Sequence, residues 1–528
     1  MKRRTFLSGL ALAPATFMLP SQFSRAQAMS KELKGTLVVA ASLDPKSMNT
    51  NYDTFGGSNY INTNIMSKLS GFDHMKNELY ADLATSWDIS DDLLTYTFKL
   101  REGVKWHDGQ PFTSADVKWT IDDIIQMGEK AATYKFVADI KEIETPDDHT
   151  VVMHLHRPNG IMVQNFASYN GFNILPKHLY EGTNGRDNPY NMKPIGTGPF
   201  KFVEYVVGSH VILEPNPEYF GEGPYLERLV FQIMPNLPTA LMALEAGQVG
   251  YITASPPFAD VPRLKQSSQL QVDPTPSTIV MWFGFNFSKP MWQDIRLRLG
   301  VSHAINREEI VSKLYQNQVN PAWGHFTSAV PWANNPDARQ PEFDLAKAEQ
   351  LLDEAGYKKD GSGKRMSIEM IVFPTNIWGS VDQAQMVKQQ LSAVGIDVQV
   401  KVVEFALRVE EISKRNFDLV HGGGTRGPDP SELVNYYDSK SPRNDSRYAN
   451  PKIDELLVAG RGTASQEERR KIYFEIQKIL CEEQPTVPMV EYSYMRPHRK
   501  EYSGFSWQPE AAGKNREHMY DFVRLVQS

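Results

Sequence analysis

Histidines with a spacing that could suit metal binding or catalysis occur at two places in the chain. His154 and His156 alternate along a predicted strand, so both side chains point to one face, as a pair of metal ligands would. No third ligand lies near them in the sequence, and we therefore expect packed or solvent-facing histidines. Trp106-His107-Asp108-Gly109 is the second place, and Asp-Gly after a strand is typical of a tight turn. We expect this segment to specify the fold.

Motifs of the common hydrolases are missing from the sequence. It contains no Gly-x-Ser-x-Gly nucleophile elbow and no His-Glu-x-x-His zinc motif. The single cysteine, Cys481, excludes an internal disulfide and a cysteine-cluster metal site, and its helix-like surroundings predict a buried, inert thiol. We therefore expect no enzyme, no bound metal and no cofactor.

A glycine run, Gly422-Gly423-Gly424, follows a short apolar strand. It lacks the Gly-Lys-Ser/Thr that a phosphate-binding loop requires. Glycine lets a ligand come close to backbone N–H and C=O groups, because no side chain stands in the way. We therefore expect Gly423, Gly424 and Thr425 to contact a ligand through the backbone.

Arg426 is the second residue after this run, Asp429 lies three residues further on, and both are candidate ligand-binding residues. The planar guanidinium of arginine suits a carboxylate or a phosphate, which it can bind through two parallel hydrogen bonds. Arg426 is therefore a candidate for binding an anionic group of the ligand from the surface of a cleft. The alternative is a salt bridge between Arg426 and Asp429 or another neighbour.

Composition limits the classes of protein to which the chain can belong. Its 528 residues, 41% of them hydrophobic and 11% aromatic, can form a sizeable core and about two to four domains. The 56 Lys and Arg residues stand against 63 Asp and Glu, and the formal net charge of −7 disfavours a nucleic-acid partner. No run of about 18 apolar residues occurs, so we expect no membrane-spanning helix.

The N-terminus has the features of an export signal. Met1-Lys2-Arg3-Arg4-Thr5-Phe6-Leu7 precedes a weakly apolar stretch to residue 19, and Ala26-Gln27-Ala28 fits a cleavage site. The paired arginines are typical of a twin-arginine signal peptide, here residues 1–28. No cysteine lies near the cleavage site, so we expect a periplasmic protein without a lipid anchor.

The remaining chain reads as a mixed α/β protein. In its second half, segments whose apolar residues have helical spacing alternate with short apolar strands, as in βαβ units. The expected strands there are Met366–Phe373, Asp397–Glu404 and Phe417–Gly422, and the expected helices are Ile295–Ala304, Glu308–Tyr315, Leu345–Ala355, Val381–Val394 and Glu467–Cys481.

One continuous block is specific enough to indicate a family. It consists of Leu83–Trp87, Ser90–Asp92, Tyr96–Phe98, Leu100–Phe112 and Ser114–Val117. The block resembles the signature of the oligopeptide/dipeptide/nickel-binding family of ABC-transporter solute-binding proteins, called family 5. Further matching segments follow in the family's order: Pro194–Phe202, Gly284–Asn286, Ala304–Arg307, Leu345–Gly356, Leu391–Val400, Phe417–Asp418, Tyr448–Asp454 and Arg469–Met489.

The resemblance implies an α/β periplasmic binding protein with two lobes, two crossover segments and an extra domain inserted in the first lobe. The lobes hinge shut over the ligand. Carried onto this chain, lobe I comprises 29–60, 195–285 and 488–528, the inserted domain 61–194, and lobe II 286–487.

The resemblance also bears on the ligand. In peptide-binding relatives, an acidic residue ahead of an Asp-Pro pair holds the amino terminus of the ligand, and Arg426 occupies that place here. In dipeptide binders, a basic residue after the strand equivalent to Met366–Phe373 takes the carboxylate, whereas Pro374–Trp378 carries no charge. Both departures argue against a plain dipeptide held by its two termini. Of this chain's tryptophans, Trp282 and Trp378 are expected nearest the cleft, with Asn376 in the same uncharged loop as Trp378.

We therefore expect a monomeric substrate-binding protein that delivers a small organic ligand to an inner-membrane ABC permease. The first hypothesis for the ligand is a peptide, a modified peptide or an amino-acid conjugate such as an opine. The second is an oligosaccharide or a sugar derivative. A secreted hydrolase and a chaperone-like or signalling receptor of the same fold are the alternatives from other classes.

Overall fold

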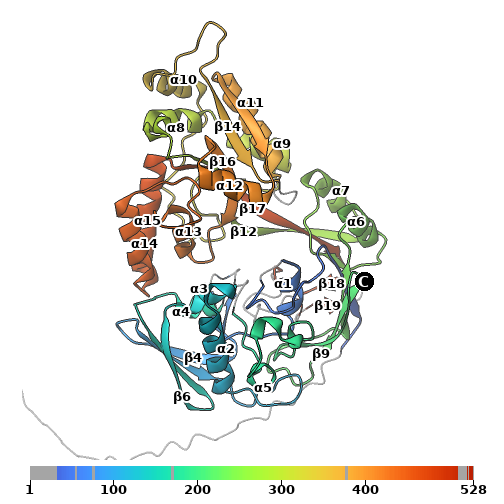
Figure 1. Ribbon diagram of the computed structural model, residues 1–528. Coiled ribbons are helices and arrows are strands. Elements are labelled where there is room, and N and C mark those ends of the chain that lie inside the picture. The colour runs from blue at the N-terminus through green and yellow to red at the C-terminus, as the bar shows by residue number, and fades with distance from the viewer. Residues whose placement is uncertain are drawn as a thin grey trace, which may run out of the picture. The chain divides into compact units, whose positions relative to one another are not determined.

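Two long strands, β12 (Leu270–Phe285) and β17 (Thr486–Arg499), run side by side in one mixed sheet (Figure 1). They pair antiparallel from Leu270 opposite Arg499 to Gly284 opposite Thr486. The register shifts between Pro276 and Val280 and again between Met281 and Trp282. These strands connect the two ends of the sheet, whose order is β15-β14-β16-β12-β17-β11-β1-β10-β9-β8.

The computed structural model describes residues 33–526, apart from 54–55, 74–75, 77, 168–171, 375–378, 509–519 and 521–522. The predicted signal peptide lies outside the described residues. The chain from Leu33 to Ser528 clusters as one unit. None of the described helices has both the length and the apolarity that crossing a bilayer requires.

One end of the sheet is built mainly by the first half of the chain. Here β1 lies parallel to β10 and β11, and β9 and β8 continue antiparallel. The helices α6 and α7 follow in sequence and pack through a small apolar core with Met495 of β17. The bounds are β1 (Thr36–Ala41), β8 (Phe200–Val206), β9 (His210–Pro215), β10 (Arg228–Ile233), β11 (Tyr251–Ile252), α6 (Leu237–Glu245) and α7 (Val261–Lys265).

The other end of the sheet contains the predicted alternation of strands and helices. β14 lies parallel to both β15 and β16. The three strands expected in this half are confirmed, and so are the five helices. The bounds are β13 (Asn320–Pro321), β14 (Met366–Val372), β15 (Ile396–Val402), β16 (Leu419–Thr425), α8 (Ile295–His303), α9 (Arg307–Tyr315), α10 (Leu345–Glu354), α11 (Ser380–Ala393), α12 (Phe405–Lys414), α13 (Val434–Tyr437), α14 (Pro451–Arg461) and α15 (Gln466–Glu483).

A separate antiparallel sheet, of order β4-β5-β7-β6, is formed between β1 and β8 in the sequence. Residues 95–100 and 150–155 alternate between the two faces of a sheet, and they form the paired strands β5 and β7. The buried face of this pair packs on α2. The bounds here are α1 (Gly56–Asn62), β2 (Ser70–Asp73), β3 (Glu78–Ala81), β4 (Ala84–Ile89), β5 (Thr95–Leu100), α2 (Ser114–Met127), α3 (Tyr134–Val137), β6 (Ile140–Asp147), β7 (Thr150–Leu155), α4 (Met162–Phe166) and α5 (Lys177–Tyr180). The short pair β18 (Tyr502–Ser503) and β19 (Arg524–Leu525) lies near the C-terminus.

The predicted turn after β5 is present at the expected place. Gly109 has φ +91°, and its N–H donates to the carbonyl of Trp106 at 2.8 Å. The ring of His107 contacts the Gly198 carbonyl at 3.0 Å, and burial lowers its pKa to about 4. The Trp106–Gly109 segment therefore fixes the four-stranded sheet against the segment 196–198, which begins the return to β8.

Candidate ligand-binding site

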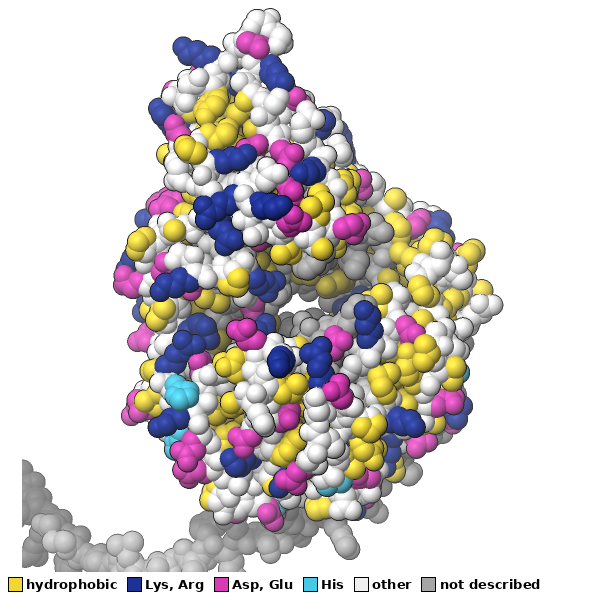
Figure 2. All heavy atoms as spheres, in the orientation of Figure 1, with side chains coloured by type: hydrophobic (Ala, Val, Ile, Leu, Met, Phe, Trp, Pro, Cys, Tyr) yellow, Lys and Arg dark blue, Asp and Glu magenta, His cyan; other side chains and the backbone are white. Residues whose placement is uncertain are grey.

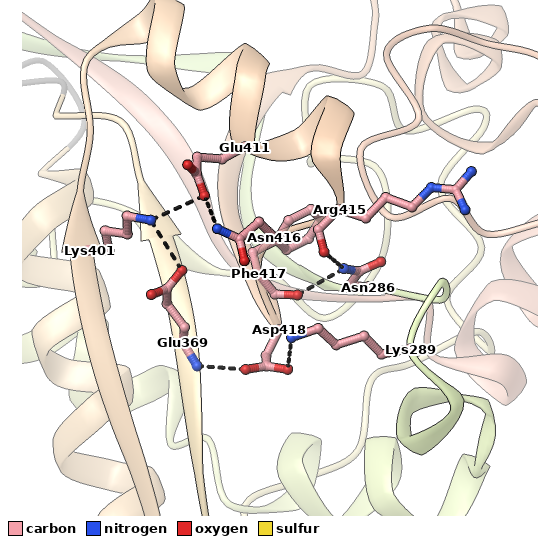
Figure 3. A network of polar contacts seen from close by, with 9 residues as sticks. All are labelled: Asn286, Lys289, Glu369, Lys401, Glu411, Arg415, Asn416, Phe417 and Asp418. Carbon is pink, nitrogen blue, oxygen red and sulfur yellow. Dashed lines mark hydrogen bonds and ion pairs between the residues drawn. The ribbon is translucent and has the colours of Figure 1, made fainter.

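The start of β16 is fixed by a network of polar contacts (Figure 3). Asp418, the residue before the strand, accepts hydrogen bonds from Lys289 Nζ at 2.6 Å and from the backbone N–H of Glu369 at 2.8 Å. Asn286 Nδ2 donates to the carbonyl of Phe417 at 2.8 Å. These bonds tie β16 to β14 on one side and to the end of β12 on the other.

A second group in Figure 3 holds the chain that leads into β16. Glu411 of α12 accepts from Lys401 Nζ at 3.1 Å and from Asn416 Nδ2 at 2.7 Å. Lys401 also lies 3.6 Å from Glu369 of β14. Because α12, β15 and β14 are joined in this way, the position of β16 and of the glycine run at its far end is set by several elements.

The far end of β16 has an open backbone edge. On one edge, β16 pairs with β12 over its whole length, from Leu419 opposite Phe285 to Thr425 opposite Ile279. On the other edge, and among the described residues, β14 pairs only with Leu419 and Val420. In an antiparallel ladder, alternate N–H and C=O groups point away from the partner strand. Some backbone groups of residues 422–425 are therefore available to an extended ligand.

Aromatic rings lie directly against the glycine run. A Cβ atom at Gly422 would stand 2.7 Å from the ring of Trp282, and one at Gly424 would overlap the hydroxyl of Tyr436. Real Cβ atoms do not approach other atoms so closely, so a side chain at either position would displace one of the two rings. The glycines thus serve close packing on the ring side as well as leaving the backbone of 422–425 accessible.

Arg426 lies in a cage of three aromatic residues, Trp282, Tyr436 and Tyr437, which we call the aromatic cage. Its guanidinium carbon stands 3.5 Å from the ring centroid of Tyr436, 5.7 Å from Trp282 and 5.6 Å from Tyr437. The side chain is only 1% exposed. The expectation that Arg426 stands on the surface of the cleft is therefore wrong, because the side chain follows Gly422 and Gly424 onto the ring side of β16.

Asp429 does not pair with Arg426, which contradicts the alternative prediction for these two residues. Its Oδ1 accepts from Arg469 Nη2 at 2.6 Å, with both side chains buried, and from the N–H of Ser431 at 2.8 Å. Arg469 also donates to the carbonyl of Gly460 at 2.9 Å. Asp429 therefore anchors the loop after β16 to α15 and to the end of α14.

His325 contacts Tyr437, one of the three residues of the aromatic cage. Its Nδ1 lies 3.0 Å from the Tyr437 hydroxyl, which in turn contacts the Thr486 hydroxyl at 2.8 Å. Burial, together with the nearby positive charge of Arg426, lowers the pKa of His325 to about 3. The ring is therefore neutral at physiological pH.

The sequence predicted only part of this arrangement of residues. Gly423, Gly424, Thr425, Arg426 and Trp282 come together at the end of β16, whereas Asn376 and Trp378 lie outside the described residues. Tyr436, Tyr437 and Arg469 were missed, because an adjacent tyrosine pair in a short helix has no periodic pattern to mark it.

The histidine pair does not assemble a metal site. His154 Nε2 lies 3.1 Å from Glu144 of the neighbouring strand, and His156 is exposed beyond the end of β7. Within the described part of the chain, no three His, Cys, Asp or Glu side chains are grouped as metal ligands would be. Cys481 is partly buried in α15, where its thiol contacts the carbonyl of Ala338 at 3.2 Å and burial raises its pKa to about 12.

A hollow is visible on the face shown in Figure 2, between the surface over α12–α15 and the surface over α1–α5. Charged side chains of both signs are scattered around it, and no single sign dominates this face. The rim of the hollow on this face therefore carries charges of both signs and is neither uniformly basic nor uniformly acidic.

The chain is similar to known binding proteins in sequence and in fold. The chain is 29% identical to the oligopeptide-binding protein AppA of Bacillus subtilis, over 85% of both chains. Its fold matches the ABC transporter substrate-binding protein CtaP of Listeria monocytogenes with a TM-score of 0.83 and 27% identity, covering 94% of this chain and 100% of CtaP. It also matches the periplasmic binding protein DppA of Helicobacter pylori, solved with the peptide STSA, with a TM-score of 0.77 and 27% identity over 94% and 99% of the chains.

The family assignment covers most of the sequence. Residues 78–445 match the bacterial extracellular solute-binding proteins, family 5. The α/β periplasmic binding protein fold predicted from the sequence is confirmed by the solved relatives, and the family is one of binding proteins and not of enzymes. The chain belongs to the bacterial extracellular solute-binding proteins of family 5.

Proposed function

We propose that the protein captures peptides or peptide-like ligands in the periplasm and delivers them to an inner-membrane ABC permease. The open backbone edge at residues 422–425 is the observation that carries the proposal. An extended peptide can add to such an edge through main-chain hydrogen bonds, which do not depend on its sequence. The names of the relatives support this ligand class, since DppA was solved with a peptide and AppA with a nonapeptide.

The proposed contacts follow from the geometry of the site. Gly423, Gly424 and Thr425 offer backbone groups, and Trp282 packs beneath them. Asn376 and Trp378 belong to the loop after β14 and are proposed to line the same site.

Asp429 is proposed to act indirectly. It holds the loop after β16 in place through Arg469. Its buried position is consistent with a supporting role.

The division into domains is proposed as expected from the sequence. Lobe I comprises 29–60, 195–285 and 488–528, the inserted domain 61–194, and lobe II 286–487. The inserted domain is supported by its separate four-stranded sheet, and the crossover by β12 and β17. Closure of the lobes over the ligand is part of the proposal.

Export is proposed to use the twin-arginine signal at residues 1–28, which leaves a mature periplasmic monomer without a lipid anchor. Arg3 and Arg4 carry this proposal.

An oligosaccharide ligand is the second candidate, because the rings of Trp282 and Tyr436 border the site and aromatic faces also stack on sugars. Native mass spectrometry of protein freshly prepared from the periplasm separates the two. We expect a retained mass that fragments into amino-acid residues. A mass built of hexose units would favour the second candidate and contradict peptide binding.

A further inference from the structure

We infer that Arg426 and the aromatic cage form a subsite for an anionic group of the ligand. The inference rests on the proposed function for the nature of the ligand as a whole, and it adds that one part of this ligand is a carboxylate or another oxyanion. The part concerned lies beside the end of β16.

Two of the three guanidinium nitrogens of Arg426 have no hydrogen-bond acceptor in the described part of the chain. These are the buried Nε and Nη1, and the buried indole N–H of Trp282 in the same cage has no acceptor there either. Buried polar groups are almost always paired, because an unpaired donor loses its bonds to water without replacement. Three unpaired donors in one cage point to an acceptor that arrives with the ligand.

Another buried arginine of the same lobe shows what a structural guanidinium looks like. Arg307 is also 1% exposed, but it donates to the carbonyls of Pro488 at 2.8 Å and Pro341 at 2.9 Å, and to Ser302 Oγ at 3.4 Å. Burial is therefore equal for Arg307 and Arg426, and only the presence of acceptors differs. This difference separates a structural role from a role in binding.

The charge of Arg426 is also not neutralised by the protein. Among the described residues, no carboxylate oxygen lies within ion-pair distance of its guanidinium, since Asp429 is paired with Arg469. The neighbouring His325 is neutral, and the Tyr437 hydroxyl is bonded to His325 and Thr486. Cation–π contacts with the cage stabilise the guanidinium in part, but they use the ring faces and leave its N–H groups free.

A ligand on the open edge of β16 passes directly beside this cage. Gly422 packs on Trp282 and Gly424 on Tyr436, so the cage begins where the open backbone ends. A carboxylate from a ligand terminus, from an acidic side chain or from an amino-acid conjugate can accept two N–H bonds from one guanidinium. A phosphate or sulfate shares this chemistry.

The first test uses the ligand-free protein and compares Arg426→Met with Arg307→Met. Methionine fills a similar apolar space without charge. We expect Arg426→Met to keep or raise the melting temperature, because it removes an uncompensated buried cation, and Arg307→Met to lower it by several degrees. A similar loss in both variants would make Arg426 a structural residue and overturn the inference.

The second test measures binding of three probes by calorimetry: trialanine, N-succinyl-trialanine and inorganic sulfate. We expect Arg426→Met to weaken the binding of N-succinyl-trialanine by about 30-fold or more and to change the binding of trialanine by less than about threefold. Arg426→Lys should recover only part of the loss, because an ammonium cannot form the two-pronged contact.

The outcomes separate the two proposals. Equal binding of both peptides to the parent and to Arg426→Met leaves peptide transport standing and overturns the anion subsite. Binding of sulfate that depends on Arg426, without binding of either peptide, supports the subsite and contradicts the choice of peptides as ligands. Absence of all binding, together with a lower melting temperature of Arg426→Met, overturns the subsite.

Discussion

The backbone N–H of Gly160 donates a 2.8 Å hydrogen bond to the carbonyl of Arg461. This bond joins the segment after β7 to the end of α14, two segments about 300 positions apart in the sequence. Asp139 adds to the contact, since it accepts from Asn159 Nδ2 at 2.8 Å and lies 3.8 Å from Arg461 Nη2. The proposed inserted domain and the proposed lobe II are therefore fastened to each other away from β12 and β17.

Gly160→Ala should weaken ligand binding without touching the ligand. A Cβ atom at residue 160 would overlap the carbonyl of Thr463, so alanine opposes this contact. We expect an affinity loss of about tenfold, equivalent to about 1.4 kcal/mol, carried mainly by faster dissociation. Gly361→Ala is the matched control, because a Cβ atom there meets open space. Stopped-flow dissociation rates that are equal for the parent and both variants would show that the contact does not slow the release of ligand.

Asp429→Ala should destabilise the fold strongly. It leaves Arg469 buried without its partner, and removing one member of a buried pair costs about 3–5 kcal/mol. Urea unfolding measures the change in the free energy of unfolding. Lys471→Ala breaks the exposed pair with Glu467 and should cost less than about 1 kcal/mol. Comparable losses in the two variants would contradict the anchoring role of Asp429.

Stability should fall as the pH drops below about 6.5, partly because of buried histidines. Burial lowers the pKa of His325 and His421 to about 3, below the ordinary value near 6.5. As the pH falls, these two histidines are protonated in the unfolded chain before they are protonated in the folded chain. The free energy of unfolding is therefore unaffected by them above pH 6.5 and decreases as the pH falls from 6.5 toward 3. Each histidine contributes a slope of up to about 1.4 kcal/mol per pH unit.

His325→Gln isolates this effect from the titration of carboxylates. Urea unfolding between pH 7 and pH 4 should give a shallower dependence for the variant than for the parent. Parallel curves would show that His325 takes up its proton equally in the folded and unfolded chains.

Replacing Arg3 and Arg4 by Lys should leave the precursor in the cytoplasm while the mature protein still folds. Cell fractionation and immunoblotting measure the distribution. An unchanged periplasmic yield in a strain that lacks the twin-arginine machinery would show that another route exports the protein.

The sequence predicted the elements of the fold better than the orientation of the key side chain. The block from Leu83 to Val117 and the strands of the second half have residue patterns that are set by local burial. These patterns could be recognised in the sequence, so the corresponding elements were predicted. The period of two along β16, continued to the residue after the strand, places Gly422, Gly424 and Arg426 on one side. This pattern could have indicated that Arg426 faces Trp282. The cage itself could not be predicted, because Tyr436 reaches it only through the placement of α13 against β16.

The strand β17 follows every other strand of the large sheet in the sequence, yet it contributes to the cores at both ends of that sheet. Val487, Met489, Val490 and Tyr492 lie in the core beside β14 and β16, and Met495 lies in the core under α6 and α7. A chain that stops before Thr486 therefore lacks part of two cores at once. Neither end of the sheet is complete until β17 has been synthesised, so both cores have to wait for the same strand.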